Sequence, residues 1–482
     1  MSYIAKYLQL AQIIIADIEN ERLKLNEKLP SLRTISQLHR VSMTTALACY
    51  RYLEQQGYAV AEEKKGFYVQ KPFQMGSITS ANLFPQFTSK ITKILTDKHS
   101  ANENISIYSL ATAQLDEALV DKKLLSHCMQ TVMKKYAFNL GYDTPQGELP
   151  LREQLATHFS QQGFTSKADE LIITNGCLDA VVLALEVVSE PNDVIAVSSP
   201  CYSGLLDILS LLNRAVIEIP STENGIDLIQ LERVIKKHNI AACLITANHQ
   251  NPTGHSLSHD QKQQLANLAR KYQLPIVEDD VFRELSHQRI IPLPIKYYDQ
   301  DGWVLWCSSF SKALAPGLRL GWCNPGRFLA RYQQQRKIRT LGTNQPMQLA
   351  MADYLAKGHY VRHLKKVNRE LFGHCKLYLS VLEQHLSEYL SKGRQGELNK
   401  QWQIYYPTGG LVLWVRIAEL NTELLAISLA EQGVLIKSGH LFSTTQLYQD
   451  CFRINLGLVP NDDIFRQLKI IAKSASQIIF KK

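Results

Sequence analysis

Lys312 lies in the stretch CSSFSKALAPGLRLGW, at 307–322, whose residue types suit covalent chemistry on a phosphorylated ligand. A lysine amine can form a Schiff base with an aldehyde. The hydroxyls of Ser309 and Ser311 and the guanidinium of Arg319 suit a phosphate, because they donate hydrogen bonds to its oxygens. A solvated surface lysine needs no such neighbours. The stretch therefore predicts a site for a ligand that carries both an aldehyde and a phosphate.

Four further segments carry polar residues of complementary types. In LIITNGCLDAVVLAL, a strand pattern turns at a glycine into a helix pattern, and the free backbone N–H groups of such a helix start attract an anion. The other segments are SSPCYSG, HQNPTG and IVEDDVF, which offer an aromatic ring, an amide and a carboxylate. The candidate residues of the four segments are Gly176, Cys177, Leu178, Tyr202, Asn251 and Asp279.

Pyridoxal 5′-phosphate (PLP) is one ligand that needs all of these residue types. Lys312 would bind its aldehyde, and Asp279 would keep its ring nitrogen protonated, which makes the ring an electron sink. Asn251 would donate to the phenolic oxygen, and Tyr202 would stack on the ring. The phosphate would be bound by Gly176, Cys177, Leu178, Ser309, Ser311 and Arg319. Each residue alone also fits a structural role, such as a helix cap or a core aromatic, but their joint occurrence in this order favours the cofactor.

The elements that position these residues alternate between strand and helix from about residue 110 onward. Apolar strand patterns occur at ELIIT, DVIAVSS, AVIEIP, ACLITA, PIVEDD, VLWCSSF and LRLGW, and helical patterns such as 258–272 separate several of them. Short apolar strands alternating with helices predict an α/β fold with a mostly parallel sheet covered on both faces. Because ligand sites in such sheets gather at the carboxyl ends of the strands, we expect the candidate residues to meet there.

The first seventy residues have a different pattern. Apolar residues recur at three- and four-residue steps over 4–23, a second short helix follows Ser31, and a third is expected over 43–55. Two short β-rich runs around Gly66 predict a hairpin. Three helices and a hairpin are typical of a winged helix-turn-helix, whose third helix enters the major groove of DNA. The alternative is a small helical adaptor domain without a DNA role.

The residues expected to contact DNA lie at the start of the second helix, at the start of the third helix and at the hairpin tip. An arginine at the second helix suits a phosphate or a base edge, and lysines at a hairpin tip suit the DNA backbone. The residues at the third helix are mostly small and polar, which suits base edges. In chain order the set is Arg33, Ser42, Met43, Thr44, Thr45, Lys64 and Lys65.

Both halves of the chain resemble known families. LPSLRTISQLHRVSMTTALACYRYLEQQGY, at 29–58, resembles the GntR-type DNA-binding domain. The region from about 105 to 475 resembles the fold type I, class I aminotransferases through HQNPTG, EDD, SSFSK, PGLRLGW and FRINLG. This second resemblance implies that Arg453 binds a substrate carboxylate and that Tyr142 borders the substrate pocket. It also shows a departure, because Phe282 occupies a position where the family commonly has a tyrosine that donates to the phenolic oxygen.

A GntR-type domain joined to an aminotransferase-like domain resembles the MocR-type transcription regulators. The expected boundaries are 1–71 for the winged helix-turn-helix, 72–105 for a linker and a lead-in helix at NLFPQFTSKITKIL, and 106–482 for the PLP-binding domain. The resemblance implies a homodimer, with a head-to-tail pairing as one arrangement, that reads paired half-sites in double-stranded DNA. It also implies an effector whose amino group exchanges with Lys312 to form an aldimine.

Composition is that of a folded cytoplasmic protein. The chain has 482 residues, of which 45% are hydrophobic and 20% charged, and it shows neither a signal peptide nor the ~18–20-residue apolar run of a membrane span. The nine cysteines include no C-x-x-C pair, so neither a metal site nor a disulfide framework is expected. The net charge of +9 includes a basic stretch over 327–376, which is either a solvated helical face or an anion-facing surface.

Three functions remain open from the sequence. The leading one is a PLP-binding transcription regulator whose large domain senses an amino compound. The second is an active PLP-dependent aminotransferase with an accessory DNA-binding domain, and Phe282 weighs against efficient transamination. The third is a DNA-binding dimer whose large domain is only a scaffold, which leaves the joint occurrence of Lys312, Arg319, Asp279 and Asn251 unexplained.

Overall fold

The computed structural model describes residues 6–20, 22–24, 27–55, 58–62, 66–69, 86–87, 109–135, 144–222, 225–288, 290–390, 402–445 and 447–480. The chain forms two compact units. The first comprises Met1–Gln74 and Gln288–Ile290, and the second comprises Met75–His287 and Ile291–Lys482. No helix within the described ranges is long and apolar enough to span a bilayer.

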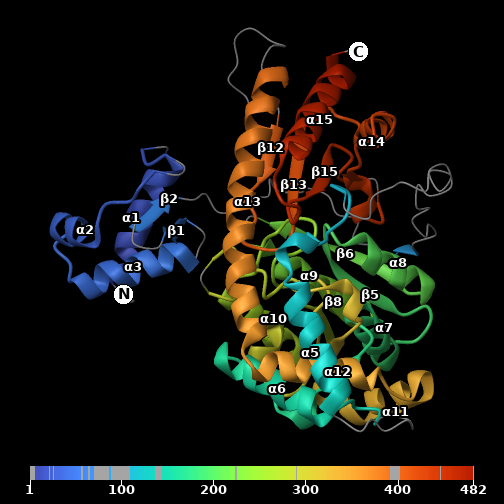
Figure 1. Ribbon diagram of the computed structural model, residues 1–482. Coiled ribbons are helices and arrows are strands. Elements are labelled where there is room, and N and C mark those ends of the chain that lie inside the picture. The colour runs from blue at the N-terminus through green and yellow to red at the C-terminus, as the bar shows by residue number, and fades with distance from the viewer. Residues whose placement is uncertain are drawn as a thin grey trace. The chain divides into compact units, whose positions relative to one another are not determined.

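The described part of the first unit contains three helices and a two-stranded antiparallel sheet (Figure 1). Helices α1 and α2 both pack on α3 around an apolar core that includes Ile14, Ile35 and Leu53. Ser31 caps α2, because its Oγ accepts from the Thr34 N–H at 3.1 Å. The elements are α1 (Lys6–Glu19), α2 (Leu32–Leu38), α3 (Met43–Gln55), β1 (Ala59–Glu62) and β2 (Gly66–Val69). The predicted winged helix-turn-helix is confirmed, with a first helix shorter than expected.

In the described part of the second unit, a nine-stranded mixed sheet forms the centre. Its order is β3-β6-β5-β8-β9-β10-β11-β4, and β7 pairs with β6. The strands from β6 to β10 run parallel, whereas β3, β11 and β4 run antiparallel to their neighbours. The strands are β3 (Gln86–Phe87), β4 (Ile172–Thr174), β5 (Val194–Ser199), β6 (Ala215–Thr222), β7 (Gly225–Ile226), β8 (Ile240–Ile245), β9 (Ile276–Asp279), β10 (Val304–Ser309) and β11 (Gly321–Asn324).

Helices cover both faces of this sheet, as its alternating side chains require (Figure 1). On β10, Leu305 and Cys307 point to one face of the sheet and join the apolar cluster of α7 and α8. Val304 and Trp306 point to the other face. Val304 joins the cluster of α9 and α10, and Trp306 joins a third cluster that includes α6. Helix α11 packs on α7, and α12 packs on α5 and α6. The helices are α5 (Lys122–Lys135), α6 (Leu149–Gln161), α7 (Cys177–Val188), α8 (Ser203–Leu211), α9 (Leu228–Lys237), α10 (His259–Tyr272), α11 (Leu329–Thr340) and α12 (Gln345–Ala356).

The described residues of the C-terminal part of the second unit form a four-stranded antiparallel sheet with three helices. The sheet order is β12-β13-β15-β14, and the long helix α13 packs along α15 (Figure 1). The elements are α13 (His359–Leu390), β12 (Trp402–Tyr405), β13 (Val412–Ile417), α14 (Thr422–Ala430), β14 (Lys437–Ser438), β15 (Cys451–Asn455) and α15 (Asp462–Phe480).

The prediction of a lead-in helix at NLFPQFTSKITKIL is wrong for the two residues of this segment that the structure describes. Gln86 and Phe87 form strand β3, which pairs with Val216 and Ala215 of β6. Pro85 precedes them in the sequence, and a proline removes a helical hydrogen bond and disfavours helix for the residue before it. The rest of that segment lies outside the described residues.

Candidate functional site

Lys312 lies in the connection between β10 and β11, with its side chain half-buried. Its Nζ donates to the backbone oxygen of Ala113 at 2.8 Å. Burial and the nearby Arg453 guanidinium together lower the pKa of Lys312 to about 8, although the Asp279 charge opposes the shift. A lysine with this pKa is partly neutral at physiological pH, so its amine is available as a nucleophile.

Asp279 ends β9, the strand next to β10, and its side chain is buried. Its Oδ1 accepts from the Cys177 thiol at 3.2 Å and from the Val281 N–H at 3.4 Å. Burial raises the pKa of Asp279, whereas the Cys177 hydrogen bond and the Lys312 charge lower it. The carboxylate therefore lies between the start of α7 and Lys312, in a place where a cationic partner would stabilise it.

Gly176 and Arg319 form a tight cradle at the N-terminus of α7. Gly176 has a φ of +107°, and a Cβ there would lie 2.8 Å from Arg319 Nη2. Arg319 Nη2 donates to the Asn175 oxygen at 2.7 Å, which fixes the guanidinium beside the helix start. The first backbone N–H groups of a helix lack intrahelical acceptors, so this end of α7 combines free donors with a cation and suits a phosphate. The Leu178 side chain is apolar and exposed, so only the backbone N–H of Leu178 can contribute to phosphate binding.

Ser309 and Ser311 flank the lysine in the same connection. Ser309 ends β10 and is buried, and its Oγ accepts from the Ser311 N–H at 3.3 Å. Both hydroxyls thus belong to the segment that carries Lys312 and lie at the carboxyl end of a sheet strand, as the sequence predicted for the cluster.

Arg453, on β15, is buried in the same cluster. Its Nη1 donates to Asn251 Oδ1 at 3.2 Å, and its Nη2 donates to the backbone oxygen of Ala111. Its Nε is buried and has no hydrogen-bond partner among the described residues. Burial lowers the pKa of Arg453 to about 10, and Tyr202 opposes the shift. Because Asn251 Oδ1 is used, its Nδ2 is the atom left to donate.

Tyr202 immediately precedes α8 and is close to the same arginine. Burial raises the pKa of Tyr202, and the Arg453 charge lowers it. A Cβ at residue 204 would lie 2.7 Å from the Tyr202 ring, so Gly204 leaves room for the ring against its own chain. The structure therefore brings Lys312, Asp279 and Arg453 together with a flat aromatic side chain.

The carbonyls of Ala111 and Ala113 are members of this site that the sequence analysis missed. Their segment is fixed along β15, since the Asn455 N–H donates to the Leu110 oxygen at 2.8 Å. Backbone oxygens carry no side-chain signal, so no residue pattern could have identified them. Tyr142 lies outside the described residues. Phe282 is buried in the apolar core, where it adds no polar group to the site.

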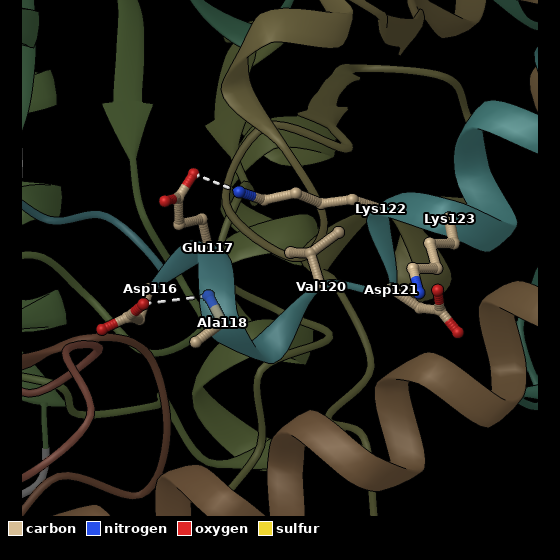
Figure 2. A pocket seen from close by; sticks show the side chains of 7 residues that line it. All are labelled: Asp116, Glu117, Ala118, Val120, Asp121, Lys122 and Lys123. Atoms are coloured by element: carbon tan, nitrogen blue, oxygen red, sulfur yellow. Dashed lines mark hydrogen bonds and ion pairs between the residues drawn. The ribbon is translucent and has the colours of Figure 1, made fainter.

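A hollow beside the start of α5 does not belong to the site. Figure 2 shows it lined by residues of the 3₁₀ helix η1 (Glu117–Leu119) and the start of α5, where Lys122 reaches back to Glu117 at 2.6 Å. Asp116 caps η1 by accepting from the Ala118 N–H at 2.9 Å. These contacts are local and between largely exposed groups, and none of the predicted site residues lines the hollow.

Part of the basic stretch over 327–376 is ion-paired with acidic residues. Three arginines of α11 face acidic residues of α7 and the loop after it. The pairs are Arg336–Asp179 at 3.3 Å, Arg339–Glu186 at 2.6 Å and Arg331–Glu190 at 3.4 Å. Because these arginines already have acidic partners, the basic residues of α11 are better explained as a helical face than as a surface that binds an anion. Lys365 and Lys366 of α13 are exposed.

In the first unit, the described DNA contacts predicted from the sequence lie at the starts of α2 and α3. Arg33, Ser42, Met43 and Thr44 are exposed, and Thr45 is half-buried. Ser42 caps the helix, because its Oγ accepts from the Thr45 N–H at 3.0 Å and also lies 2.9 Å from Thr44 Oγ1. Lys64 and Lys65 lie outside the described residues. Arg40, exposed in the turn before α3, is an additional cation that the motif did not single out.

Comparison with known proteins agrees with both units. The family described as Aminotransferase class I and II matches residues 119–468, and the family of bacterial regulatory proteins, gntR family, matches residues 6–69. The uncharacterized HTH-type transcriptional regulator YdcR of Escherichia coli is 32% identical over 93% of this chain and 94% of its own length. YjiR of the same organism, also an uncharacterized HTH-type transcriptional regulator, is 31% identical over 97% of this chain and 98% of its own.

Solved structures show the same fold in the second unit. The multiple substrate aminotransferase of Thermococcus profundus superposes with a TM-score of 0.71 at 22% identity, covering 82% of this chain and 97% of its own. The kynurenine aminotransferase of Pyrococcus horikoshii has a TM-score of 0.71 at 24% identity, covering 81% and 95%. The chain therefore belongs to the MocR-type transcriptional regulators, in which a gntR-type helix-turn-helix domain is joined to an aminotransferase class I and II domain.

Proposed function

We propose that this regulator binds PLP at Lys312 and double-stranded DNA through α3, and that its DNA affinity changes when an amino compound takes the place of Lys312 on the cofactor. The observation that carries the proposal is the set of complementary groups around Lys312. A lysine of lowered pKa, a buried carboxylate, a helix N-terminus with an arginine, and a second, poorly compensated arginine occur in one cluster.

The residues present fit PLP. When bound, PLP supplies an aldehyde carbon that condenses reversibly with amines and a ring that withdraws electrons. Asp279 would hold the proton on the ring nitrogen, and the buried Cys177 thiol keeps that carboxylate oriented. The α7 N-terminus, with Arg319 fixed beside Gly176, would bind the phosphate together with Ser309 and Ser311.

The remaining contacts to the ring follow from the same cluster. Asn251 Nδ2 would donate to the phenolic oxygen, and the Tyr202 ring would cover one face of the cofactor. Phe282 adds no donor, so the environment of the phenolic oxygen has one hydrogen bond fewer than in relatives that carry a tyrosine. This difference supports a sensing role over efficient transamination.

Arg453 would bind the carboxylate of the effector. Its present acceptors are two neutral oxygens, and its buried Nε has no partner among the described residues. A carboxylate would form a charge-assisted, bidentate pair that is stronger than either neutral contact. The effector is therefore an amino compound with a carboxylate, placed so that its amine competes with Lys312 Nζ.

DNA recognition is assigned to Arg33 and to the start of α3, where Ser42, Met43 and Thr44 are exposed. A two-fold symmetric homodimer in the cytoplasm, with head-to-tail pairing as one arrangement, would read paired half-sites. The effector then binds one of two dimer arrangements more tightly, and DNA binds the other more tightly. This difference couples the effector site to the DNA site, so that binding of one ligand weakens binding of the other. No membrane partner is proposed.

The experiment measures DNA affinity with and without amino compounds. DNA fragments selected from a random library by the purified protein are labelled, and fluorescence anisotropy gives their affinity for the wild type and for Lys312→Ala. We expect both proteins to bind DNA and only the wild type to respond to the effector. An equal response of Lys312→Ala would refute sensing through Lys312. Steady conversion of the amino compound to a keto acid at enzymatic rates would establish the aminotransferase alternative instead.

A further inference from the structure

A single row of side chains crosses the four-stranded sheet at Arg453. Tyr405 on β12 pairs with Trp414 on β13, Trp414 pairs with Arg453 on β15, and Arg453 pairs with Lys437 on β14. Register partners on antiparallel strands project from the same face of a sheet, with Cα atoms about 5 Å apart. Lys437 is therefore the immediate neighbour of Arg453 on the face that carries the candidate site.

The residue after Lys437 confirms this direction. Ser438 donates from its Oγ to the Thr422 oxygen at 2.8 Å, which places its side chain against the start of α14. Because successive side chains on a strand point to opposite faces, Lys437 points away from α14. Its side chain is half-buried. Burial lowers the pKa of Lys437, the Arg453 charge lowers it further, and Asp207 of α8 opposes the shift.

The charges of this pair are poorly compensated. Lys437 has neither a hydrogen bond nor an ion pair within the part of the chain that the structure describes. Among the described residues, Arg453 donates to neutral oxygens only, those of Asn251 and Ala111. Asp207 acts on Lys437 through its field, without an ion pair to it. Two neighbouring cations in a part-buried place repel each other, and an anion bound between them would relieve that repulsion.

We propose that Lys437 determines effector specificity, by binding a second anionic group on an amino acid whose carboxylate is bound by Arg453. The effector class is then an amino acid with a short side chain that ends in a carboxylate or a phosphate. This inference rests on the proposed function and narrows it. Arg453 alone would accept any α-amino acid, whereas the adjacent lysine favours dianionic ones.

The test compares ligands that differ in side-chain charge. The full-length, PLP-loaded protein is titrated by calorimetry with L-alanine, L-aspartate, L-glutamate and O-phospho-L-serine, and the absorption of the cofactor is followed in parallel. We expect the wild type to prefer the dianionic ligands over L-alanine. Lys437→Gln should reduce that preference roughly 10- to 100-fold, the range for one charge-assisted hydrogen bond, because it weakens binding of the dianionic ligands much more than binding of L-alanine. Comparison of L-aspartate and L-glutamate with O-phospho-L-serine shows whether the second anionic group is a carboxylate or a phosphate.

Two further variants keep the result interpretable. Lys437→Arg preserves the charge and should preserve the preference, and Lys469→Gln, at an exposed position of α15, should behave like the wild type. Equal losses for L-alanine and the dianionic ligands in Lys437→Gln would show a structural role and overturn the inference. Equal affinities in the wild type would overturn it as well, while the proposed function stands. If none of these ligands or any other amine alters the cofactor absorption, the proposed function fails and the inference fails with it.

Discussion

Replacement of Lys312 by methionine should stabilise the cofactor-free protein at neutral pH. The pKa of Lys312 is lowered from its ordinary value of 10.5 to about 8, mainly because the amine is desolvated. A lysine whose folded-state pKa is lowered destabilises the fold below that pKa, because the unfolded chain binds the proton more tightly. Methionine has a similar length and no charge, so Lys312→Met removes this penalty.

The pKa shift of Lys312 sets the size of the stability gain expected for Lys312→Met. At about 1.4 kcal/mol per pKa unit, the penalty at pH 7 is about 3 kcal/mol, and solvent screening of the part-buried amine reduces it. Loss of the hydrogen bond to the Ala113 oxygen costs about 1 kcal/mol. The net gain for Lys312→Met at pH 7 is then about 1–2 kcal/mol. As the pH rises from about 8 towards 10.5, the wild type recovers its stability, and the variant should become the less stable protein.

Urea unfolding followed by tryptophan fluorescence measures this difference, because all five tryptophans belong to the second unit. Lys366→Met, at an exposed position of α13, is the matched control and should change stability little at either pH. A Lys312→Met protein that is less stable at pH 7, or a difference that does not depend on pH, would refute the desolvation of Lys312.

Three further substitutions test separate parts of the site. Gly176→Ala should weaken PLP binding at least ~10-fold in a fluorescence titration, because the new Cβ meets Arg319 Nη2 at 2.8 Å and the residue has a φ of +107°; unchanged affinity would remove the cradle from the phosphate site. Cys177→Ala removes the donor to Asp279 and should raise the pKa of that carboxyl, which shifts the pH titration of the cofactor absorption; identical titrations would show that the thiol does not orient Asp279. Thr44→Ala should weaken DNA binding by about 1 kcal/mol without changing PLP content, as anisotropy and absorption would show, and unaltered binding would exclude the start of α3 from the interface.

The fold was predictable because its signals are local. Ser31 and Ser42 cap the helices that they were expected to begin, and the apolar strand patterns correspond to strands of the central sheet. The prediction for the lead-in segment failed because Gln86 and Phe87 pair with β6, a strand that lies more than a hundred residues later in the chain. Pairing between distant residues is not encoded in local periodicity.

The candidate site was predictable only where side chains carry the chemistry. Lys312 and Asp279 could be selected by residue type and position, and Arg453 through the family resemblance; the structure places the three within one cluster. The Ala113 carbonyl and the position of Lys437 beside Arg453 follow from register and chain path, which the sequence does not show. The Cys177 thiol was assigned through its backbone, whereas the structure gives its side chain a contact with Asp279.

The most direct measurement is the absorption spectrum of the purified protein with PLP, from about 300 to about 500 nm, for the wild type and Lys312→Ala. We expect the wild type to show a band in the region of ~420 nm that moves when an amino acid effector is added, and Lys312→Ala to lack the band while retaining its fold. A wild type without such a band after addition of PLP, or an identical band in Lys312→Ala, would contradict the assignment of Lys312 as the residue that holds the cofactor.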